Sequence, residues 1–254
     1  MDMGKNKLQK FKDLEEFPHV FQLRYSDIIE GTEFEQKGNW QSFFCNDHPI
    51  VLELGCGRGE YSVGLAERFP EKNFIGIDMK GARLWAGAKE ALNKQLSNVA
   101  FVRTNIDLLP HFFAPNEVSE IWLTFPDPQM KKRNKRLTST RMMQQYEQVL
   151  RPDGSIHLKT DSAFLFTYTK AMAEQNKLPI VTELEDIDQQ ATSGHILAIR
   201  TYYEQQWLAR GIAIKYLRLL LRHPAKWEEP DMLIPLDEYR SYGRSKRSAL
   251  NLTV

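Results

Sequence analysis

Cysteine is scarce in this sequence: Cys45 and Cys56 are the only two among 254 residues. Two cysteines are too few for a disulfide framework, and no set of four Cys and His ligands with zinc-site spacing accompanies them. The six histidines are scattered along the chain and are interpreted as core or surface residues. The sequence therefore predicts no metal site and a reducing, cytoplasmic location.

Long apolar runs and an excess of one charge are missing too. The first residues, MDMGKNKLQKFK, contain no apolar stretch of signal-peptide length, and no window reaches the run of about 18 apolar residues that a membrane helix needs. We expect no membrane partner. Lys and Arg number 34 against 33 Asp and Glu, so the net charge favours no class of partner by itself.

What is present is an ordinary globular composition, 42% apolar and 26% charged, in which strand-like and helical patterns alternate. Short runs rich in Ile, Val and Phe predict strands at residues 50–54, 73–77, 99–103, 120–125 and 154–159. Apolar residues at helical spacing predict helices within 84–96, 142–150 and 164–172. This order predicts an α/β, doubly wound, mostly parallel sheet that binds ligands at the carboxyl ends of its strands.

Three glycines follow the first predicted strand. Gly55, Gly57 and Gly59, in VLELGCGRGEY, let the backbone turn tightly and approach a ligand without an intervening Cβ. Their spacing departs from the dinucleotide fingerprint, which weakens the case for NAD. A tight turn between strand and helix is the structural alternative.

Polar residues mark the other strand ends. Asp78 stands 19 positions after Gly59, close to the distance at which an acid meets ribose hydroxyls in such folds, although it also suits a helix cap. Asn105, after the third strand, suits a cap or the edge of an adenine. Glu53 interrupts an apolar strand, where an unpaired carboxylate is costly, so we expect it to face a cationic or hydrogen-bond-donating ligand group.

Asp127 lies between Pro126 and Pro128 directly after the fourth predicted strand, so its side chain is held in one direction. A basic run begins four positions later. It contains Lys131, Lys132, Arg133, Lys135, Arg136 and Arg141, with no acid before Glu147. The run has the character of a phosphate-binding surface, and a solvated loop is the alternative.

Together these segments resemble the tRNA (guanine-N7-)-methyltransferases over roughly residues 48–221. The similar motifs are ELGCGRGEY, FIGID, FPDP followed by KKRNKRLT, LKTD at 158–161, and TYYEQQWLARG at 201–211. This sequence departs from the family in two places: Gln129 and Met130 stand where the family usually has Trp-Pro, and the basic run lacks the usual histidine and is shorter.

The resemblance implies a single-domain, Rossmann-like methyltransferase sheet of seven strands. It divides the chain into an N-terminal segment with a basic start (1–48), a methyltransferase domain (49–221) and a C-terminal extension whose role is open (222–254). It implies S-adenosylmethionine as cofactor, tRNA as partner, and methyl transfer to N7 of a guanine in the variable loop. The oligomeric state is left undetermined.

The resemblance also assigns roles to residues. The expected cofactor-binding residues are Glu53, Gly55, Gly57, Gly59, Asp78, Asn105 and Asp127. The expected tRNA- or guanine-binding residues are Lys131, Asp161, Thr201, Tyr203 and Glu204. Asp127 is the expected catalytic residue.

The predicted chemistry explains why no His or Cys constellation is needed. Guanine N7 carries a lone pair and no proton, so methyl transfer requires alignment and electrostatic support rather than a strong base. Two alternatives remain open: a methyltransferase of the same fold acting on a protein or small-molecule nitrogen, and a non-catalytic RNA-binding module.

Overall fold

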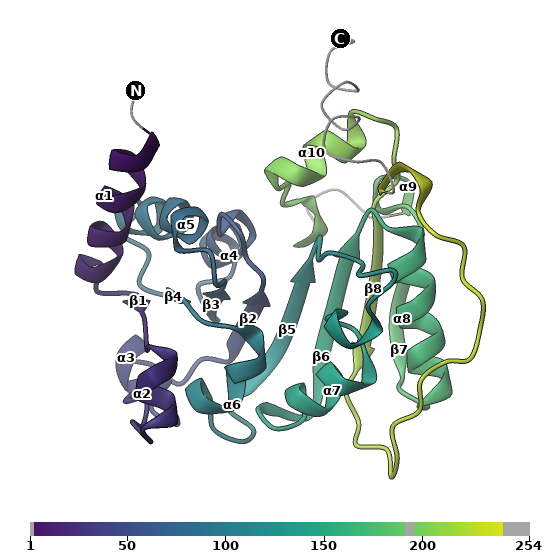
Figure 1. Cartoon of the computed structure of the whole chain (residues 1–254), viewed down its shortest axis with the longest axis horizontal. Helices are drawn as coiled ribbons and strands as arrows, with labels where there is room; N and C mark the ends of the chain where they lie inside the picture. Colours follow the sequence, from purple (N-terminus) through teal and green to yellow (C-terminus); the bar gives the residue numbers. More distant parts are fainter. Residues whose placement is uncertain (1–2, 191–195, 241–254) are drawn as a thin grey trace.

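One eight-stranded sheet runs through the protein in the order β1-β4-β3-β2-β5-β6-β8-β7 (Figure 1). The structure is a computed structural model that describes residues 3–190 and 196–240. The strands are β1 (Val20–Phe21), β2 (Ile50–Leu54), β3 (Asn73–Ile77), β4 (Val99–Val102), β5 (Val118–Thr124), β6 (Leu150–Thr160), β7 (Ile180–Leu184) and β8 (Lys215–Leu220). All five predicted strands are confirmed, with small shifts at their ends.

The seven strands that the resemblance implied are one too few. The additional strand is β1, which has two residues and pairs in parallel with β4 at the edge of the sheet. Phe101 N donates to His19 O over 2.8 Å, and Arg103 N donates to Phe21 O over 2.9 Å. These bonds pair backbone groups of β4 that would otherwise be unpaired on a sheet edge.

The strand order reverses next to β2. From β2 the chain adds β3 and then β4 on one side, whereas β5 and then β6 lie on the other side, all in parallel. The loops after β2 and β5 therefore meet at the switch point, where open α/β sheets bind their ligands. Beyond β6 the sheet turns antiparallel, because β8 lies between β6 and β7.

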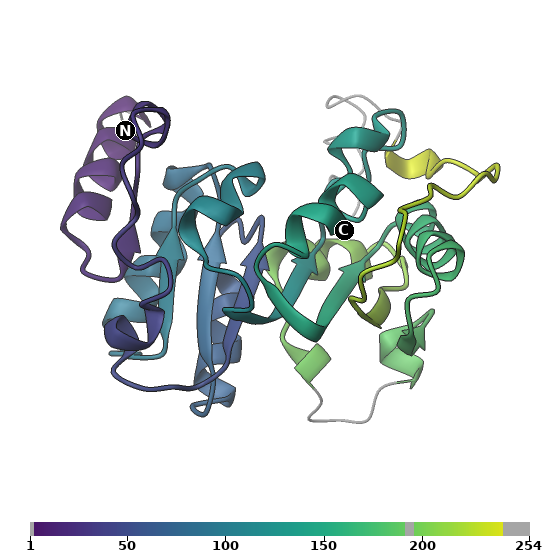
Figure 2. The same ribbon diagram turned by 90° about the horizontal axis from the view of Figure 1, so that it is seen from below.

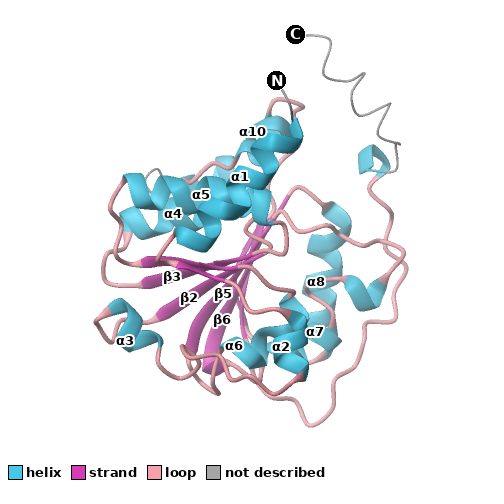
Figure 3. Cartoon of the chain, turned by 60° about the vertical axis from the view of Figure 1, so that its left-hand side comes forward, coloured by secondary structure: helices cyan, strands magenta, loops and turns pink. Residues whose placement is uncertain are grey.

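Helices cover both faces of the sheet. They are α1 (Met3–Glu16), α2 (Tyr25–Ile29), α3 (Trp40–Phe44), α4 (Glu60–Arg68), α5 (Gly81–Asn93), α6 (Leu109–Phe112), α7 (Thr140–Tyr146), α8 (Ala163–Gln175), α9 (Ile187–Gln190) and α10 (Tyr202–Leu208). Figure 3 shows α1, α4, α5 and α10 on one face and α6, α7 and α8 on the other. Two predicted helices were too long: Leu96 lies beyond α5, and Leu150 begins β6.

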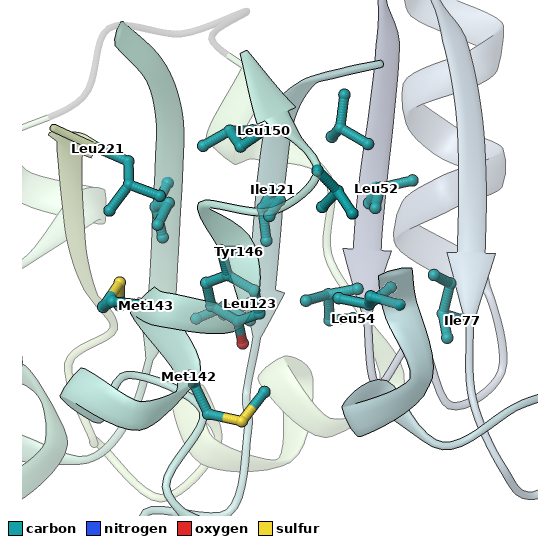
Figure 4. Close-up of a cluster of buried hydrophobic side chains, with 14 of the residues drawn as sticks. Leu52, Leu54, Ile77, Ile121, Leu123, Met142, Met143, Tyr146, Leu150 and Leu221 are labelled. Carbon is teal, nitrogen blue, oxygen red and sulfur yellow. The ribbon is translucent and has the colours of Figure 1, made fainter. Parts of the chain in front are cut away.

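The central strands are buried on both faces. Every residue of β2 and β3 is buried, which explains their continuous apolar runs. Figure 4 shows part of one hydrophobic core, in which Leu123 of the sheet lies beside Met143 and Tyr146 of α7; Leu52 and Leu54 belong to the same cluster. Among the described residues, no helix combines the length and apolar character that crossing a bilayer requires.

After β8 the chain returns along α8, as the yellow segment of Figures 1 and 2 shows. We call residues 222–240 the C-terminal strap. Near the carboxyl end of α8, Asn176 Nδ2 donates to Glu228 O over 2.7 Å. Further along, Glu229 accepts hydrogen bonds from the Tyr168 hydroxyl over 2.6 Å and from the Thr140 hydroxyl over 2.7 Å. The strap therefore packs against the α7 and α8 layer.

Candidate active site

The glycine loop after β2 is open on one side. Gly55, Gly57 and Gly59 have φ values of 76°, 58° and 70°, in the left-handed region that favours glycine. A Cβ on Gly55 would meet nothing within 4 Å, and one on Gly57 would meet only Gly55 O at 4.0 Å. A Cβ on Gly59 would lie 2.7 Å from the Phe101 ring. The first two glycines thus leave room for a ligand, whereas the third allows close packing.

Asp78 joins the end of β3 to this loop. Its Oδ2 accepts a hydrogen bond from Gly57 N over 2.9 Å, and its Oδ1 accepts one from Lys80 N over 2.7 Å. The N-cap residue of α5 is Lys80, so Asp78 supports the start of the helix without being its cap. The structure therefore places a half-buried carboxylate directly beside the open glycines.

Glu53 is buried behind the loop, with 3% of its surface exposed. Its carboxylate accepts hydrogen bonds from Ser62 N over 2.9 Å, from the Ser62 hydroxyl over 2.5 Å and from the Thr124 hydroxyl over 2.5 Å. The donors that we expected from a ligand are thus supplied by α4 and β5. Burial raises the pKa of Glu53 to about 7, and these hydrogen bonds oppose the rise.

We expect the wild type to lose stability relative to a Glu53→Gln variant as the pH rises from 4.5 to about 7. Because the pKa lies near 7 in the folded protein and near 4.5 in the unfolded chain, the folded protein binds more protons in this interval. Its free energy of unfolding therefore falls with rising pH, by roughly 3 kcal/mol at about 1.4 kcal/mol per pH unit.

Urea unfolding at about pH 5 and about pH 8 measures this difference. Glu71→Gln, which alters an exposed carboxylate, is the matched control. Parallel pH dependences in the wild type and Glu53→Gln would contradict the assignment.

Asn105 follows β4 and caps the short helix Ile106–Leu108 by accepting a hydrogen bond from Asp107 N over 3.2 Å. The predicted capping role is confirmed. Asn105 also lines a cleft of about 1110 Å³ together with Met79 and Arg103 from the ends of β3 and β4. The other wall of this cleft belongs to the N-terminal segment and includes residues 22–25. Met79 directly follows Asp78 in the chain, so this cleft begins one residue beyond that carboxylate.

The loop after β5 turns sharply on both sides of Asp127. Phe125 has a φ of 50° and Gln129 a φ of 46°, so both residues adopt the left-handed conformation. Asp127 Oδ1 accepts a hydrogen bond from Gln129 N over 3.0 Å, and the side chain is exposed. Because β5 lies beside β2, the structure places this carboxylate at the switch point with the glycine loop.

Arg136 fixes this loop through hydrogen bonds to its backbone. Its guanidinium donates to Pro128 O over 3.1 Å, to Gln129 O over 3.2 Å and to Met130 O over 3.3 Å, and it lies 4.0 Å above the Tyr168 ring. Only 4% of Arg136 is exposed. The interpretation of Arg136 as part of a phosphate-binding surface is therefore wrong.

The rest of the basic run is accessible. Lys131, Lys132 and Lys135 are exposed, and no carboxylate within the described ranges forms an ion pair with them. Arg133 lies 3.9 Å from Glu229, and Arg141 lies 2.9 Å from Asp107. Three lysines thus remain as a basic surface that continues from Asp127.

Lys159, near the end of β6, is fully buried and organises the segment before α10. Its Nζ donates to Glu204 Oε2 over 2.8 Å, and to Leu197 O and Ile199 O over 2.9 Å each. Burial lowers the pKa of Lys159 to about 8 and raises the pKa of Glu204. Sequence reasoning missed Lys159, although a lysine within the predicted strand 154–159 was a usable signal.

Both of the expected substrate-binding acids are buried. Glu204 is 0% exposed and forms a capping box with Thr201, whose hydroxyl accepts from Glu204 N over 3.2 Å. Asp161 is 1% exposed and accepts from the Tyr239 hydroxyl over 2.8 Å. Tyr203, by contrast, is 39% exposed.

Helix α10 also reaches the glycine loop. Tyr202 N donates to Glu60 Oε2 over 3.0 Å, and the Arg58 guanidinium lies 5.5 Å above the Tyr202 ring. The predicted residues therefore lie at one edge of the sheet. Asp127, Lys131 and Tyr203 are exposed to solvent, whereas Glu53, Asp161 and Glu204 are buried.

Comparison with known proteins shows which family this chain resembles. A family model described as “Putative methyltransferase” matches residues 47–217. The tRNA (guanine-N(7)-)-methyltransferase of Bacteroides thetaiotaomicron is 59% identical over 98% of this chain and 98% of its own length. That of Porphyromonas gingivalis is 59% identical over 92% of this chain and 98% of its own length.

The fold has solved counterparts. A crystal structure of the 16S rRNA methyltransferase KamB superposes with a TM-score of 0.57 at 14% identity, covering 73% of this chain and 94% of that chain. At this identity the likeness concerns the fold alone. The family model covers most of the chain, and the two relatives are 59% identical to it over nearly their whole length. This chain therefore belongs to the tRNA (guanine-N(7)-)-methyltransferase family.

Proposed function

We propose that this protein transfers the methyl group of S-adenosylmethionine to N7 of a guanine in the variable loop of tRNA. The observation that carries this proposal is the switch point itself, where the open glycine loop, Asp78 and the exposed Asp127 meet beside a lysine surface. The names and high identity of the relatives support the same activity. The cytoplasmic location stays a prediction.

The residues present fit the cofactor. A nucleoside needs an acceptor for its ribose hydroxyls and backbone that it can approach closely, and Asp78 with the open side of Gly55 and Gly57 offers both. Asn105 and the cleft beside it suit the adenine. Glu53 makes its hydrogen bonds within the protein, so we assign it to supporting the loop rather than to direct contact.

S-adenosylmethionine supplies a methyl group on a positively charged sulfur, and transfer moves that charge onto the guanine. A fixed carboxylate beside the reacting atoms stabilises the cationic base without taking a proton. Asp127 suits this role because one of its oxygens is held by Gln129 N and its side chain is exposed.

We assign the contacts with tRNA to the exposed residues. Lys131, Lys132 and Lys135 provide charge for backbone phosphates, and the exposed ring of Tyr203 offers a surface on which a base stacks. Since Asp161 and Glu204 are enclosed, we propose that they act by fixing the end of β6 and the start of α10.

Mapping of N7-methylguanosine in tRNA, before and after incubation with the purified protein and S-adenosylmethionine, tests the proposal. We expect one new modified guanine in the variable loop. Methylation of protein or small-molecule nitrogen instead favours the same-fold alternative. Binding of tRNA without any methyl transfer favours the non-catalytic alternative.

We expect Asp78→Ala to weaken cofactor binding by about 1 to 3 kcal/mol, because the ribose hydroxyls lose their acceptor and Gly57 N loses its partner. Calorimetric titration with S-adenosylhomocysteine measures the change. Unchanged affinity in a folded variant would leave Asp78 with only its loop-supporting contacts.

We expect Lys131→Ala combined with Lys132→Ala to lower tRNA affinity and to flatten its dependence on salt, by about one slope unit per lost phosphate contact. Cofactor affinity should not change. Lys37→Ala combined with Lys177→Ala alters two exposed lysines that lie near the amino ends of the strands, and it serves as the control. Equal salt slopes for the wild type and the first variant would show the run to be a solvated loop.

A further inference from the structure

The far end of the C-terminal strap reaches three separate parts of the candidate site. The strap leaves its first anchor at Glu229 and crosses an exposed stretch in which Leu233 is 97% exposed. It then becomes buried again at Asp237, with 5% of that residue exposed. A second anchor after an exposed crossing indicates that the contacts of residues 237–239 are specific.

The first contact is with the end of β6. The Tyr239 hydroxyl lies 2.8 Å from Asp161 Oδ2 and 3.0 Å from Asp161 O, so its single proton bonds Asp161 in either case. Asp161 is 1% exposed, and a carboxylate buried this far depends on protein donors. Tyr239 therefore helps to fix Asp161, which we assign to holding the end of β6.

The second contact is with the start of α8. Asp237 Oδ1 accepts a hydrogen bond from Phe164 N over 3.0 Å, and Asp237 Oδ2 accepts one from the Ser162 hydroxyl. Ser162 is itself the N-cap of α8, and its Oγ accepts from Leu165 N over 2.9 Å. Asp237 thus secures the residue that immediately follows Asp161.

The third contact is with the loop after β5, and the fourth is with α10. Asp237 N lies 3.2 Å from the sulfur of Met130, in the loop that carries Asp127. The Tyr239 ring packs edge-on against Trp207 of α10, with ring centroids 5.5 Å apart and an interplanar angle of 66°. Residues 237–239 therefore touch the loop after β5, the end of β6 and α10 at once.

We propose that Tyr239 and Asp237 are positioning residues for methyl transfer, which fasten the Asp127 loop, Asp161 and α10 into one rigid substrate-binding edge. This inference rests on the proposed function, because it concerns the same guanine and the same tRNA. Neither residue needs to touch the cofactor. Their loss is expected to reduce reaction with tRNA and to leave the glycine loop intact.

The test compares Tyr239→Phe, which removes only the hydroxyl and keeps the ring against Trp207, with Asp237→Asn. Tyr146→Phe is the matched control, because it also deletes one hydroxyl, which bonds Leu137 O over 2.9 Å in the core. We expect kcat/KM for tRNA to fall about 5- to 20-fold in the first two variants and less than twofold in the control. Affinity for S-adenosylhomocysteine should stay within about twofold of the wild type in all three.

A double-variant cycle separates positioning from general stability. If Tyr239 acts through Asp161, the combination of Tyr239→Phe with Asp161→Asn should react no more slowly than Asp161→Asn alone. Additive losses would indicate a purely structural role and overturn the proposal. A faster reaction in Tyr239→Phe would also overturn it, because the strap would then cover the site instead of shaping it.

Different results contradict the positioning role and the proposed function. If the wild type methylates tRNA while Tyr239→Phe and Asp237→Asn react within twofold of it, only the positioning role is lost. If the wild type binds S-adenosylhomocysteine and transfers no methyl group to tRNA, the proposed function is lost and the positioning role with it.

Discussion

Asp127→Asn is expected to lower kcat by about 10² or more, while tRNA affinity changes little. The substitution keeps nearly the same shape and removes the charge. In the structure the Asp127 carboxylate is exposed, held by Gln129 N, and placed beside the glycine loop by the pairing of β5 with β2. A contact that strengthens as charge moves onto the guanine acts on turnover more than on binding.

Single-turnover methyl transfer at saturating tRNA and cofactor measures the effect. Asp47→Asn, an exposed acid near the amino end of β2, is the matched control and should react like the wild type. A rate for Asp127→Asn within about threefold of the wild type, a barrier change below about 1 kcal/mol, would rule out the catalytic assignment.

Lys159→Met is expected to lower the free energy of unfolding by about 3 to 5 kcal/mol. The ammonium group and the Glu204 carboxylate are both 0% exposed, so the substitution removes the buried partner of this carboxylate and leaves it, among the described residues, only the ion pair with Arg200, 3.7 Å away and 35% exposed. It also removes the donor to Leu197 O and Ile199 O, the two carbonyls that bring the chain towards α10.

Denaturant unfolding of three variants tests this explanation. Lys159→Met combined with Glu204→Gln removes both charges and should be more stable than Lys159→Met alone by about 1 kcal/mol or more. Lys170→Met breaks a surface pair with Glu183 at 2.7 Å, and it should cost less than about 1 kcal/mol. Equal losses in the buried and surface variants would show that burial of the Lys159 pair is unimportant.

The features that the sequence predicted well depend on residues close together in the chain. A buried parallel strand needs a short apolar run, and a ligand loop needs glycines directly after it, so β2, β3 and the loop from Gly55 to Gly59 were all predictable. The position of Asp127 followed from the same local logic, because the carboxyl ends of parallel strands lie on one edge of the sheet.

The features that the sequence did not predict depend on contacts between distant segments. Arg136 belongs to a basic run, and only the tertiary structure shows that Tyr168 and three backbone carbonyls surround it. The burial of Glu204 likewise depends on Lys159, 45 positions earlier. The two-residue strand β1 carries no periodic signal, since two residues cannot display one.

The position of β8 in the sheet has a consequence for synthesis. Among the residues that the structure describes, β7 pairs with β8 alone, and β8 is the last of the eight strands in chain order, although it lies between β6 and β7. During translation the antiparallel part of the sheet therefore stays open until residues 215–220 emerge, and Asp237 and Tyr239 emerge later still. The nascent chain therefore completes its glycine loop well before residues 237–239 can complete the substrate-binding edge.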